Sequence, residues 1–379
     1  LSHVPVPFWQ LNATFNIEDS EWTARWERKD HKDDPENPER KSHRIIDESE
    51  KILVENAINS GNSTSVSEVN RTKKEQPPLN FDLTQLQKTA NSLWTWSANR
   101  TLGIAQDLYD KFKLITYPRT DSKYLTEDMV DDVNKVLNSL SNQDEYEPHT
   151  NRISENGLLN SKRNFNSSKV RDHYAIIPTD VKPLDTLSGD HKKLYDLIVR
   201  RFLASWHAMS EWKVTKRIAE IDNQLFIKEV QTIEVPGWRH VISKNNSTPE
   251  GWMDLPSNPC EASVKSFEFT EEKSKPINRL KEASLLQLME NAGKHIDDEE
   301  IAELMKDKGL GTPATRASII ENLIEDRKYL RRSRNGSISV TAQGIKMIDI
   351  FGREQQEHNK GSLLFYIYDN GVVEKKFLH

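Results

Sequence analysis

The sequence predicts a mixed α/β chain of several domains, in which helical winged-helix modules accompany an antiparallel β-sheet. Its 379 residues exceed what one typical hydrophobic core holds, so two or three domains are expected. Polar and apolar residues alternate from Phe8 to Phe15, which is typical of a strand with one buried face. From Leu83 to Leu93, by contrast, apolar residues keep the spacing of a helix.

The predicted sheet is assembled from two separate stretches of the chain. Its first strands cover Phe8–Phe15 and Trp22–Trp26, and a helix over Asp47–Asn59 follows after a polar run. Further strands are expected within Trp212–Val241 and over Val264–Thr270. We expect the later strands to complete the sheet that the first strands begin.

The first helical module is predicted between these stretches. A helix capped by Asp82 and a second helix over Thr101–Phe112 precede an extended segment that holds Tyr117. Two helices followed by an extended basic segment are typical of a winged-helix module, a fold that commonly places a protein on DNA. Further along, residues Asn142–Val170 are rich in Ser and Asn and predict a mobile loop.

The same outline recurs near the C-terminus. One helix is expected to end at Lys308–Gly309, a second to run over Pro313–Asp326, and a hairpin over Tyr329–Val340 to turn at Asn335–Gly336. The densest basic cluster of the chain lies on and beside this hairpin. Its members are Arg327, Lys328, Arg331, Arg332 and Arg334.

A basic run of this kind is as often a solvated face as a phosphate-contact surface. The adjacent residues favour phosphate contact, because Gly309 and Gly311 allow a close backbone approach. Thr312 and Thr315 offer hydroxyls at a helix N-terminus, where phosphate groups bind readily.

Composition limits the partners and the compartment. The net charge of -6 gives no global attraction to nucleic acid, so DNA contacts depend on local basic patches. The single cysteine, Cys260, excludes a disulfide framework and a cysteine-cluster zinc site. No apolar run reaches the ~18 residues of a membrane span. We expect a cytoplasmic protein without a membrane partner.

The stretch Leu114–Ser122 carries the most specific chemistry. Pro118 disfavours a helical conformation at Tyr117, so the phenol projects from an extended or turning backbone. Arg119 carries a planar fork that matches a phosphate group. A lone Tyr-Pro pair is more often a packed aromatic in a turn. A tyrosine beside a guanidinium, however, suits nucleophilic attack on a phosphodiester.

This nine-residue stretch resembles the active-site signature of type IA DNA topoisomerases. Five further stretches follow the order and spacing of that family. They are Phe81–Gln87, Ile104–Tyr109, Asp172–Thr179, Leu194–Phe202 and Gly309–Ala317, the last in the style of the topoisomerase III branch. The resemblance implies that Tyr117 is the nucleophile, that Arg119 binds the phosphate, and that His173 donates a hydrogen bond near it.

The resemblance also implies an activity, a partner and a domain plan. The activity is ATP-independent cleavage and religation of single-stranded DNA through a 5′-phosphotyrosine, which relaxes or decatenates DNA, and the location is the nucleoid. The implied domains are a β arch (residues 1–80 and 205–274), a tyrosine domain (81–204) and a winged-helix DNA-binding domain (275–379). The implied DNA contacts are Thr120, Asp121, Ser122, Thr312, Thr315, Arg316, Arg331 and Arg332.

One part of the family pattern is missing. Members of the family carry an N-terminal Toprim domain whose Asp-x-Asp-x-Glu cluster binds magnesium, and this sequence contains no such cluster. Its acidic groups over Glu127–Asp132 and Asp297–Glu300 are typical of helix starts. We therefore expect a fragment that binds no metal itself. Mg²⁺ belongs to the complete enzyme, with a Toprim segment supplied in cis or in trans.

Three interpretations follow. The first is a topoisomerase region that binds single-stranded DNA and cleaves poorly without Toprim. The second is an inert DNA-binding remnant in which Tyr117 is a relic. The third is another tyrosine transesterase, such as a recombinase, which the order of the motifs disfavours.

Overall fold

A computed structural model describes most of the chain in two compact units. The helical unit comprises residues 77–208 and 277–379, and the barrel unit comprises residues 2–76 and 209–276. The helical unit includes both stretches that the sequence analysis assigns to separate domains, residues 81–204 and 275–379, and that division stays a prediction. The described residues are 3–32, 34, 37–59, 61, 63–183, 187, 189–242, 252–295 and 309–347, with the backbone of two strands, 363–367 and 373–377.

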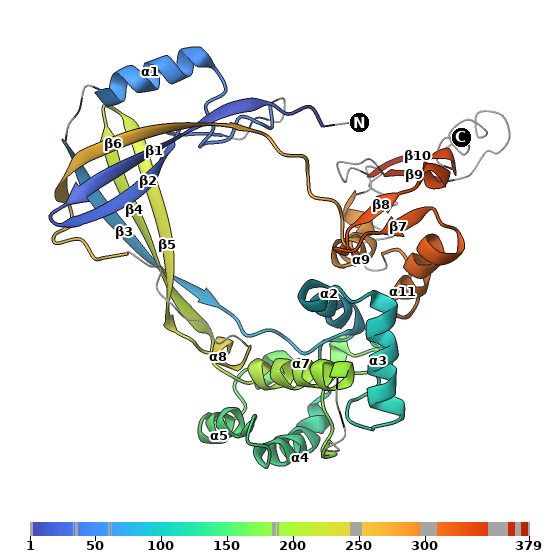
Figure 1. Cartoon of the computed structure of the whole chain (residues 1–379). Coiled ribbons are helices and arrows are strands. Elements are labelled where there is room, and N and C mark those ends of the chain that lie inside the picture. Colours follow the sequence, from blue (N-terminus) through green and yellow to red (C-terminus); the bar gives the residue numbers. More distant parts are fainter. Residues whose placement is uncertain are drawn as a thin grey trace. The chain divides into compact units, whose positions relative to one another are not determined.

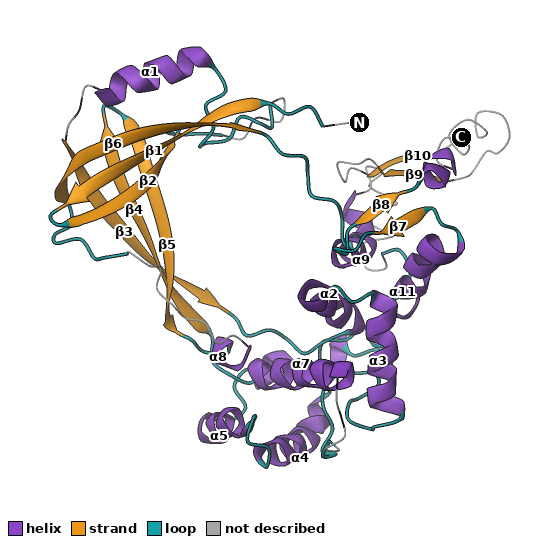
Figure 2. Cartoon of the chain, in the orientation of Figure 1, coloured by secondary structure: helices purple, strands orange, loops and turns teal. Residues whose placement is uncertain are grey.

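The barrel unit is a closed barrel of six antiparallel strands in the order β1-β2-β5-β4-β3-β6, with β6 pairing back onto β1 (Figures 1 and 2). The predicted antiparallel sheet is therefore confirmed, and it closes on itself. The strands are β1 (Pro7–Ile17), β2 (Ser20–Glu27), β3 (Ser63–Glu75), β4 (Ser210–Ile221), β5 (Gln224–Val235) and β6 (Cys260–Lys273).

Alternation along the strands creates the barrel core. Phe15 is fully buried, stacks on Trp22 with ring centroids 4.9 Å apart and meets the edge of Phe226 at 5.8 Å. The intervening side chain Thr14 points outward, where its hydroxyl lies 3.2 Å from that of Thr23. The predicted helix is confirmed as α1 (Glu48–Asn59), which contributes Val54 and Ile58 to the same core.

Replacing Phe15 by alanine should destabilise the barrel unit by about 4 kcal/mol, because a fully buried aromatic leaves a cavity that the barrel wall cannot fill. Thr14→Ala is the matched control on the outer face, and its cost should stay below about 1 kcal/mol. Urea unfolding followed by tryptophan fluorescence measures both. Equal losses for the two variants would contradict the inward placement of Phe15.

The first segment of the helical unit contains the two helices that precede the tyrosine stretch. The predicted cap of the first helix is confirmed, since Asp82 Oδ1 accepts the Gln85 N–H at 2.6 Å. The second helix begins at Ala98 rather than at the predicted Thr101, and Ser97 Oγ caps it by accepting the Arg100 N–H at 3.1 Å. The helices of this segment are α2 (Leu83–Trp94), α3 (Ala98–Asp110), α4 (Val130–Ser141), α5 (Glu147–Asn156), α6 (Ser161–Asn164) and α7 (Gly189–Ser205).

The predicted mobile loop over residues 142–170 is wrong. This stretch forms α5 and α6, with a short 3₁₀ turn at Ser167–Lys169. Its side chains Tyr146, Ile153 and Phe165 are buried, and the Asn164 amide donates to the Ser205 carbonyl at 2.9 Å. The high content of Ser and Asn predicted a loop, because it does not show that these side chains are buried or hydrogen-bonded.

The C-terminal segment of the helical unit carries the predicted hairpin. Strands β7 (Leu330–Arg332) and β8 (Ile338–Val340) pair antiparallel, and Gly336 in their turn has φ of +80°. The helix expected to end at Lys308 lies outside the described residues. The other elements are α9 (Glu282–Glu290), a 3₁₀ turn (Ala292–His295), α11 (Pro313–Glu321), a π-helical turn (Asn322–Asp326), β9 (Leu363–Ile367) and β10 (Val373–Phe377).

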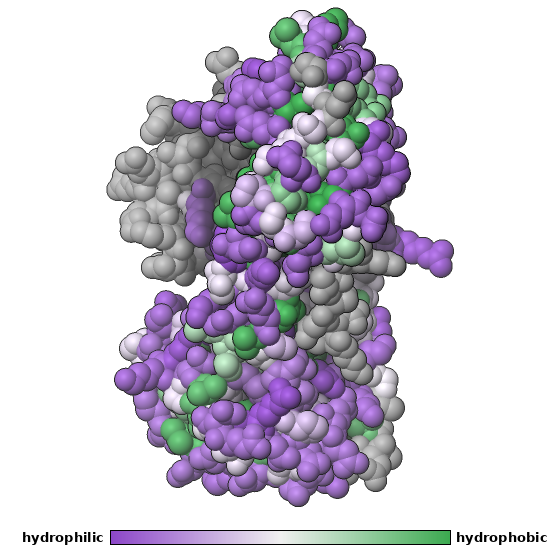
Figure 3. Space-filling view, turned by 90° about the vertical axis from the view of Figure 1, so that its left-hand side faces the viewer, coloured by the Kyte–Doolittle hydropathy of each residue, from purple (hydrophilic) through white to green (hydrophobic). Residues whose placement is uncertain are grey.

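These elements match a helix, a helix and a hairpin in order, while the winged-helix assignment itself stays a prediction. The surface in Figure 3 is hydrophilic over most of its described area, with apolar side chains in small groups. None of the helices in the described part of the chain is both long and apolar enough to cross a membrane.

Candidate functional site

The site is built where two chain segments are fastened together. We call residues 114–120 the tyrosine segment and residues 173–179 the histidine segment. Thr116 joins them, because its N–H donates to the Ile177 carbonyl at 3.0 Å and its Oγ1 accepts the Ile177 N–H at 3.0 Å. The same hydroxyl donates to the Ala175 carbonyl at 2.9 Å. Thr116 thus supplies hydrogen-bond partners for backbone groups of the histidine segment and links it to the tyrosine segment.

A second attachment lies at the far end of the tyrosine segment. Thr120 Oγ1 donates to the His173 carbonyl at 2.8 Å and accepts the Ser122 N–H at 3.0 Å. Thr120 and Ser122 are both buried, so this placement favours a structural role for their hydroxyls. Asp121 is exposed, 3.9 Å from an Arg171 nitrogen. DNA contact by these three residues stays a prediction.

Tyr117 lies between two rings. The imidazole of His173 is 4.4 Å from the Tyr117 ring centroid, and Tyr109 meets the Tyr117 ring edge-on at 5.4 Å. All three side chains line one pocket of about 620 Å³. Because the Tyr117 side chain is only partly buried, the pocket holds its ring in place and leaves it open to a ligand.

Arg119 follows Tyr117 and contacts α3. With the Gln106 amide oxygen turned towards it, the guanidinium donates to that oxygen from Nη2 at 2.9 Å and from Nε at 3.2 Å. Among the described residues, no carboxylate lies within ion-pair distance of Arg119. A neutral amide orients the guanidinium without cancelling its charge, so the charge remains available for an anion.

The predicted phosphate loop before α11 is held by an arginine from within. Arg316 is buried, and its guanidinium donates to the carbonyls of Leu310 at 3.1 Å and Gly311 at 3.2 Å, and to Thr84 Oγ1 at 3.1 Å. Arg316 therefore has the contacts of a loop-holding residue, and this favours a structural role over DNA contact. Gly311 has φ of +67°, which a glycine adopts without strain.

The remaining predicted DNA contacts differ in their surroundings. Thr312 N–H donates to Thr315 Oγ1 at 2.8 Å, which caps the start of α11. Arg331 on β7 is exposed, and its Nε lies 3.1 Å from the Ser339 hydroxyl. Its neighbour Arg332 is turned the other way and pairs with carboxylates. The structure brings none of these residues into the Tyr117 pocket.

Comparison with known proteins now identifies the family. A family model described as DNA topoisomerase matches residues 1–359. The chain belongs to the type IA DNA topoisomerases. DNA topoisomerase 3 of Bacillus subtilis is 35% identical over 302 residues, covering 76% of this chain and 41% of that protein. DNA topoisomerase 3 of Bacillus licheniformis is 36% identical over 287 residues, covering 73% and 39%.

The fold agrees with this membership. Full-length topoisomerase I from Thermotoga maritima superposes with a TM-score of 0.63 at 24% identity, over 94% of this chain and 52% of that one. The chain spans about two-fifths of the length of the curated relatives named above.

The expectation that this topoisomerase chain binds no metal ion itself stays a prediction. Within either unit taken by itself, no three His, Cys, Asp or Glu side chains of the described residues lie close enough to bind one metal ion.

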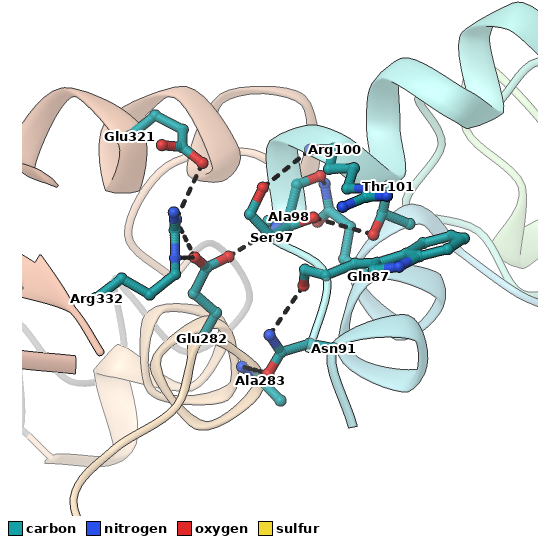
Figure 4. Close-up of polar contacts among 11 residues, drawn as sticks. Gln87, Asn91, Ser97, Ala98, Arg100, Thr101, Glu282, Ala283, Glu321 and Arg332 are labelled. Carbon is teal, nitrogen blue, oxygen red and sulfur yellow. Dashed lines mark hydrogen bonds and ion pairs between the residues drawn. The ribbon is translucent and has the colours of Figure 1, made fainter. Parts of the chain in front are cut away.

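Helix α3, which carries Gln106 and Tyr109, is held in the topoisomerase chain by a buried carboxylate (Figure 4). Glu282 at the start of α9 is 1% exposed, and its Oε2 accepts the Ala98 N–H at 2.7 Å. A carboxylate at this position satisfies a free donor of the helix N-terminus and interacts favourably with its dipole. The sequence analysis did not single out Glu282, because a glutamate that begins a helix is ordinary.

Two further groups complete this junction. Arg332 Nε donates to Glu282 Oε1 at 2.6 Å, and Arg332 Nη2 donates to Glu321 at 3.0 Å (Figure 4). The charge of Arg332 is therefore already compensated by two carboxylates, which favours a structural role over the predicted DNA contact. Asn91 of α2 accepts the Ala283 N–H at 3.1 Å, so α9 holds α2 as well as α3.

The junction perturbs the titration of its own groups. Burial raises the pKa of Glu282, because the carboxylate has lost its water, and this outweighs the lowering effects of the Ala98 N–H and Arg332. The pKa of Arg332 is also raised, since its two carboxylate partners outweigh the effect of its own burial. The raised pKa of Arg332 favours the charged pair, whereas the raised pKa of Glu282 disfavours it, because the burial of Glu282 outweighs its attraction to Arg332.

The Glu282→Gln variant should gain stability relative to the wild type as the pH rises from about 4.5. Above the ordinary glutamate pKa of 4.5, the unfolded chain releases a proton that the folded chain still binds, so the wild type loses folding stability until its raised pKa is passed. Urea unfolding of both proteins between pH 4 and 8 measures the difference. The exposed Glu325→Gln serves as control, and a Glu282→Gln difference that does not change with pH would contradict the raised pKa.

Proposed function

We propose that Tyr117 of this chain is the strand-cleaving nucleophile of a type IA topoisomerase. The phenol oxygen attacks a DNA phosphodiester and forms a phosphorus–oxygen bond, while the bond to the 3′-oxygen breaks. The phenol loses its proton and the departing 3′-oxygen gains one. The product is a 5′-phosphotyrosine, and the reverse attack reseals the strand without ATP.

The observation that carries this proposal is the surroundings of Tyr117. A free phenol has a pKa of about 10 and is a weak nucleophile at neutral pH unless its surroundings are positive. Arg119 lies two residues after it, beyond Pro118, and no described carboxylate pairs with its charge, while the His173 imidazole lies against the Tyr117 ring. Arg119 binds the phosphate oxygens that gain charge in the transition state, and His173 donates a hydrogen bond to the phosphodiester.

The substrate is single-stranded DNA, as the resemblance to the type IA family implies, and the partly exposed Tyr117 leaves its pocket open to a strand. We further propose that the exposed basic side chains of the β7–β8 hairpin, Arg331 foremost, contact DNA phosphates in the manner of a wing. The task is relaxation or decatenation in the nucleoid of the cytoplasm, as expected of a topoisomerase III-like protein.

Cleavage by this chain requires a Toprim-containing segment and its Mg²⁺, supplied in cis or in trans. The likeness to the Bacillus proteins supports this part of the proposal, since the chain spans only about two-fifths of their length. The residues of this chain contribute the nucleophile and the anion site, and the metal contributes charge at the phosphate when it is bound.

The test is covalent capture of DNA. The chain is incubated with an end-labelled single-stranded oligonucleotide and Mg²⁺, with and without a separately prepared Toprim fragment. We expect a denaturation-resistant adduct that requires the Toprim fragment. It should disappear in Tyr117→Phe and fall at least tenfold in Arg119→Lys, which keeps the charge but loses the planar fork.

The matched control is Arg171→Lys, a nearby exposed arginine that pairs loosely with Asp121 and should leave the adduct yield unchanged. DNA binding without an adduct under either condition would replace this proposal with an inert DNA-binding remnant. An adduct that survives in Tyr117→Phe would show that another residue attacks.

A further inference from the structure

The pocket around Tyr117 is larger than the proposed reaction needs. Its volume of about 620 Å³ lies within the range of ~300–1,000 Å³ that is typical of small-molecule sites. One phosphate group fills only part of this space. The lining residues are Tyr109, Lys113, Ile115, Thr116, Tyr117, His173, Tyr174 and Thr179.

Lys113 supplies an uncompensated positive charge to this lining. Its backbone has φ of +58°, and its carbonyl accepts the Thr179 hydroxyl at 2.7 Å, so the turn that presents the side chain is fastened to the histidine segment. The ammonium lies over the Tyr109 ring, 5.5 Å from its centroid. In the part of the chain that the structure describes, no carboxylate lies within ion-pair distance of it.

Lys111, two residues earlier, differs from Lys113 in having a carboxylate partner. It is a lysine of the same turn, but its ammonium is paired with Asp107 at 2.8 Å. It does not line the pocket. A lysine that lines a pocket and has no carboxylate partner can bind a phosphate group. A surface lysine that is paired with a carboxylate is common and gives no such indication.

Tyr174 supplies a free aromatic face. The residue is 37% exposed, and no aromatic ring among the described residues packs against it. Burial raises its pKa, followed by the charge of Asp132, so the ring stays neutral at physiological pH. Tyr174 and Lys113 line the same pocket, and a partly exposed ring together with a cation that lacks a carboxylate partner is the usual combination of single-strand binding sites, where bases stack and phosphates are neutralised.

We propose that Lys113 and Tyr174 form a subsite for the nucleotide next to the bond that Tyr117 attacks. Lys113 binds the phosphate of that nucleotide, and Tyr174 stacks on its base. The subsite rests on the proposed function, because it assumes that a DNA strand enters this pocket. It positions the strand and takes no part in breaking the bond.

The phosphate contact is tested by the salt dependence of binding. All variants are made in the full chain carrying Tyr117→Phe, so that binding is measured without cleavage, and a fluorescent single-stranded oligonucleotide is the probe. Lys113→Gln should lower the slope of log affinity against log salt concentration by about 0.7, the value for one lost phosphate contact. Lys111→Gln removes the same charge from the same turn and should leave the slope unchanged.

The stacking contact is tested with oligonucleotides that carry one abasic nucleotide at successive positions. In the parent protein, we expect one position at which the missing base weakens binding about tenfold. In Tyr174→Leu, binding of the intact oligonucleotide should fall by a similar factor, and the abasic scan should become flat at that position. Tyr174→Phe keeps the ring and should behave like the parent.

The outcomes separate this subsite from the proposed function. Normal binding with the same slope in Lys113→Gln and Lys111→Gln, or an abasic scan that Tyr174→Leu does not alter, would overturn the subsite and leave the role of Tyr117 intact. No binding by the parent protein, together with no adduct from the wild-type chain and Toprim, would overturn both. Thermal unfolding of each variant shows that the losses do not come from unfolding.

Discussion

The candidate site depends on the hydrogen bonds of Thr116. This residue contacts Ala175 and Ile177, which lie 59 and 61 positions further along the chain. Together with the Thr120 bond to the His173 carbonyl, these bonds hold Tyr117 and His173 in neighbouring segments. Each bond contributes only about 1 kcal/mol, yet a buried backbone group left unpaired costs more than that, so the geometry is strongly specified. The Thr116 side chain thus helps to place the Tyr117 ring beside the His173 imidazole.

The Glu282 junction gives α3 a second fixed end. At one end of the helix, the Ala98 N–H is bound by the buried carboxylate. Towards the other end, Gln106 orients Arg119 and Tyr109 packs on Tyr117. Burying a charge this completely is costly and stabilises only when every partner is present. The junction therefore links the C-terminal segment of the helical unit to the position of the proposed nucleophile.

The sequence predicted much of this structure where the signal is local. Asp82 and the apolar spacing up to Leu93 are enough to predict α2, and the Leu114–Ser122 stretch is enough to locate the tyrosine. Residues that act through distant partners were not predictable. Glu282 and Ala98 are separated by 184 positions, and no local pattern shows that one binds the other.

The same reasoning explains the basic residues. The sequence predicts Arg316 and Arg332 as DNA contacts. In the fold, Arg316 binds backbone carbonyls and Arg332 pairs with carboxylates. Gln106 lies in the Ile104–Tyr109 stretch, but only the structure shows that it contacts Arg119. Lys113 lies outside every motif, and only the pocket shows that its charge is unpaired.

The most direct measurement is to map the residue that carries DNA after reaction with the Toprim fragment, by mass spectrometry of tryptic peptides. Tyr109, Tyr117 and Tyr174 line one pocket but fall on three different tryptic peptides, because Lys111, Lys113, Arg119 and Arg171 separate them. A nucleotide on the Leu114–Arg119 peptide, attached through its 5′-phosphate, is the result this account predicts. A nucleotide on either of the other two peptides would contradict it.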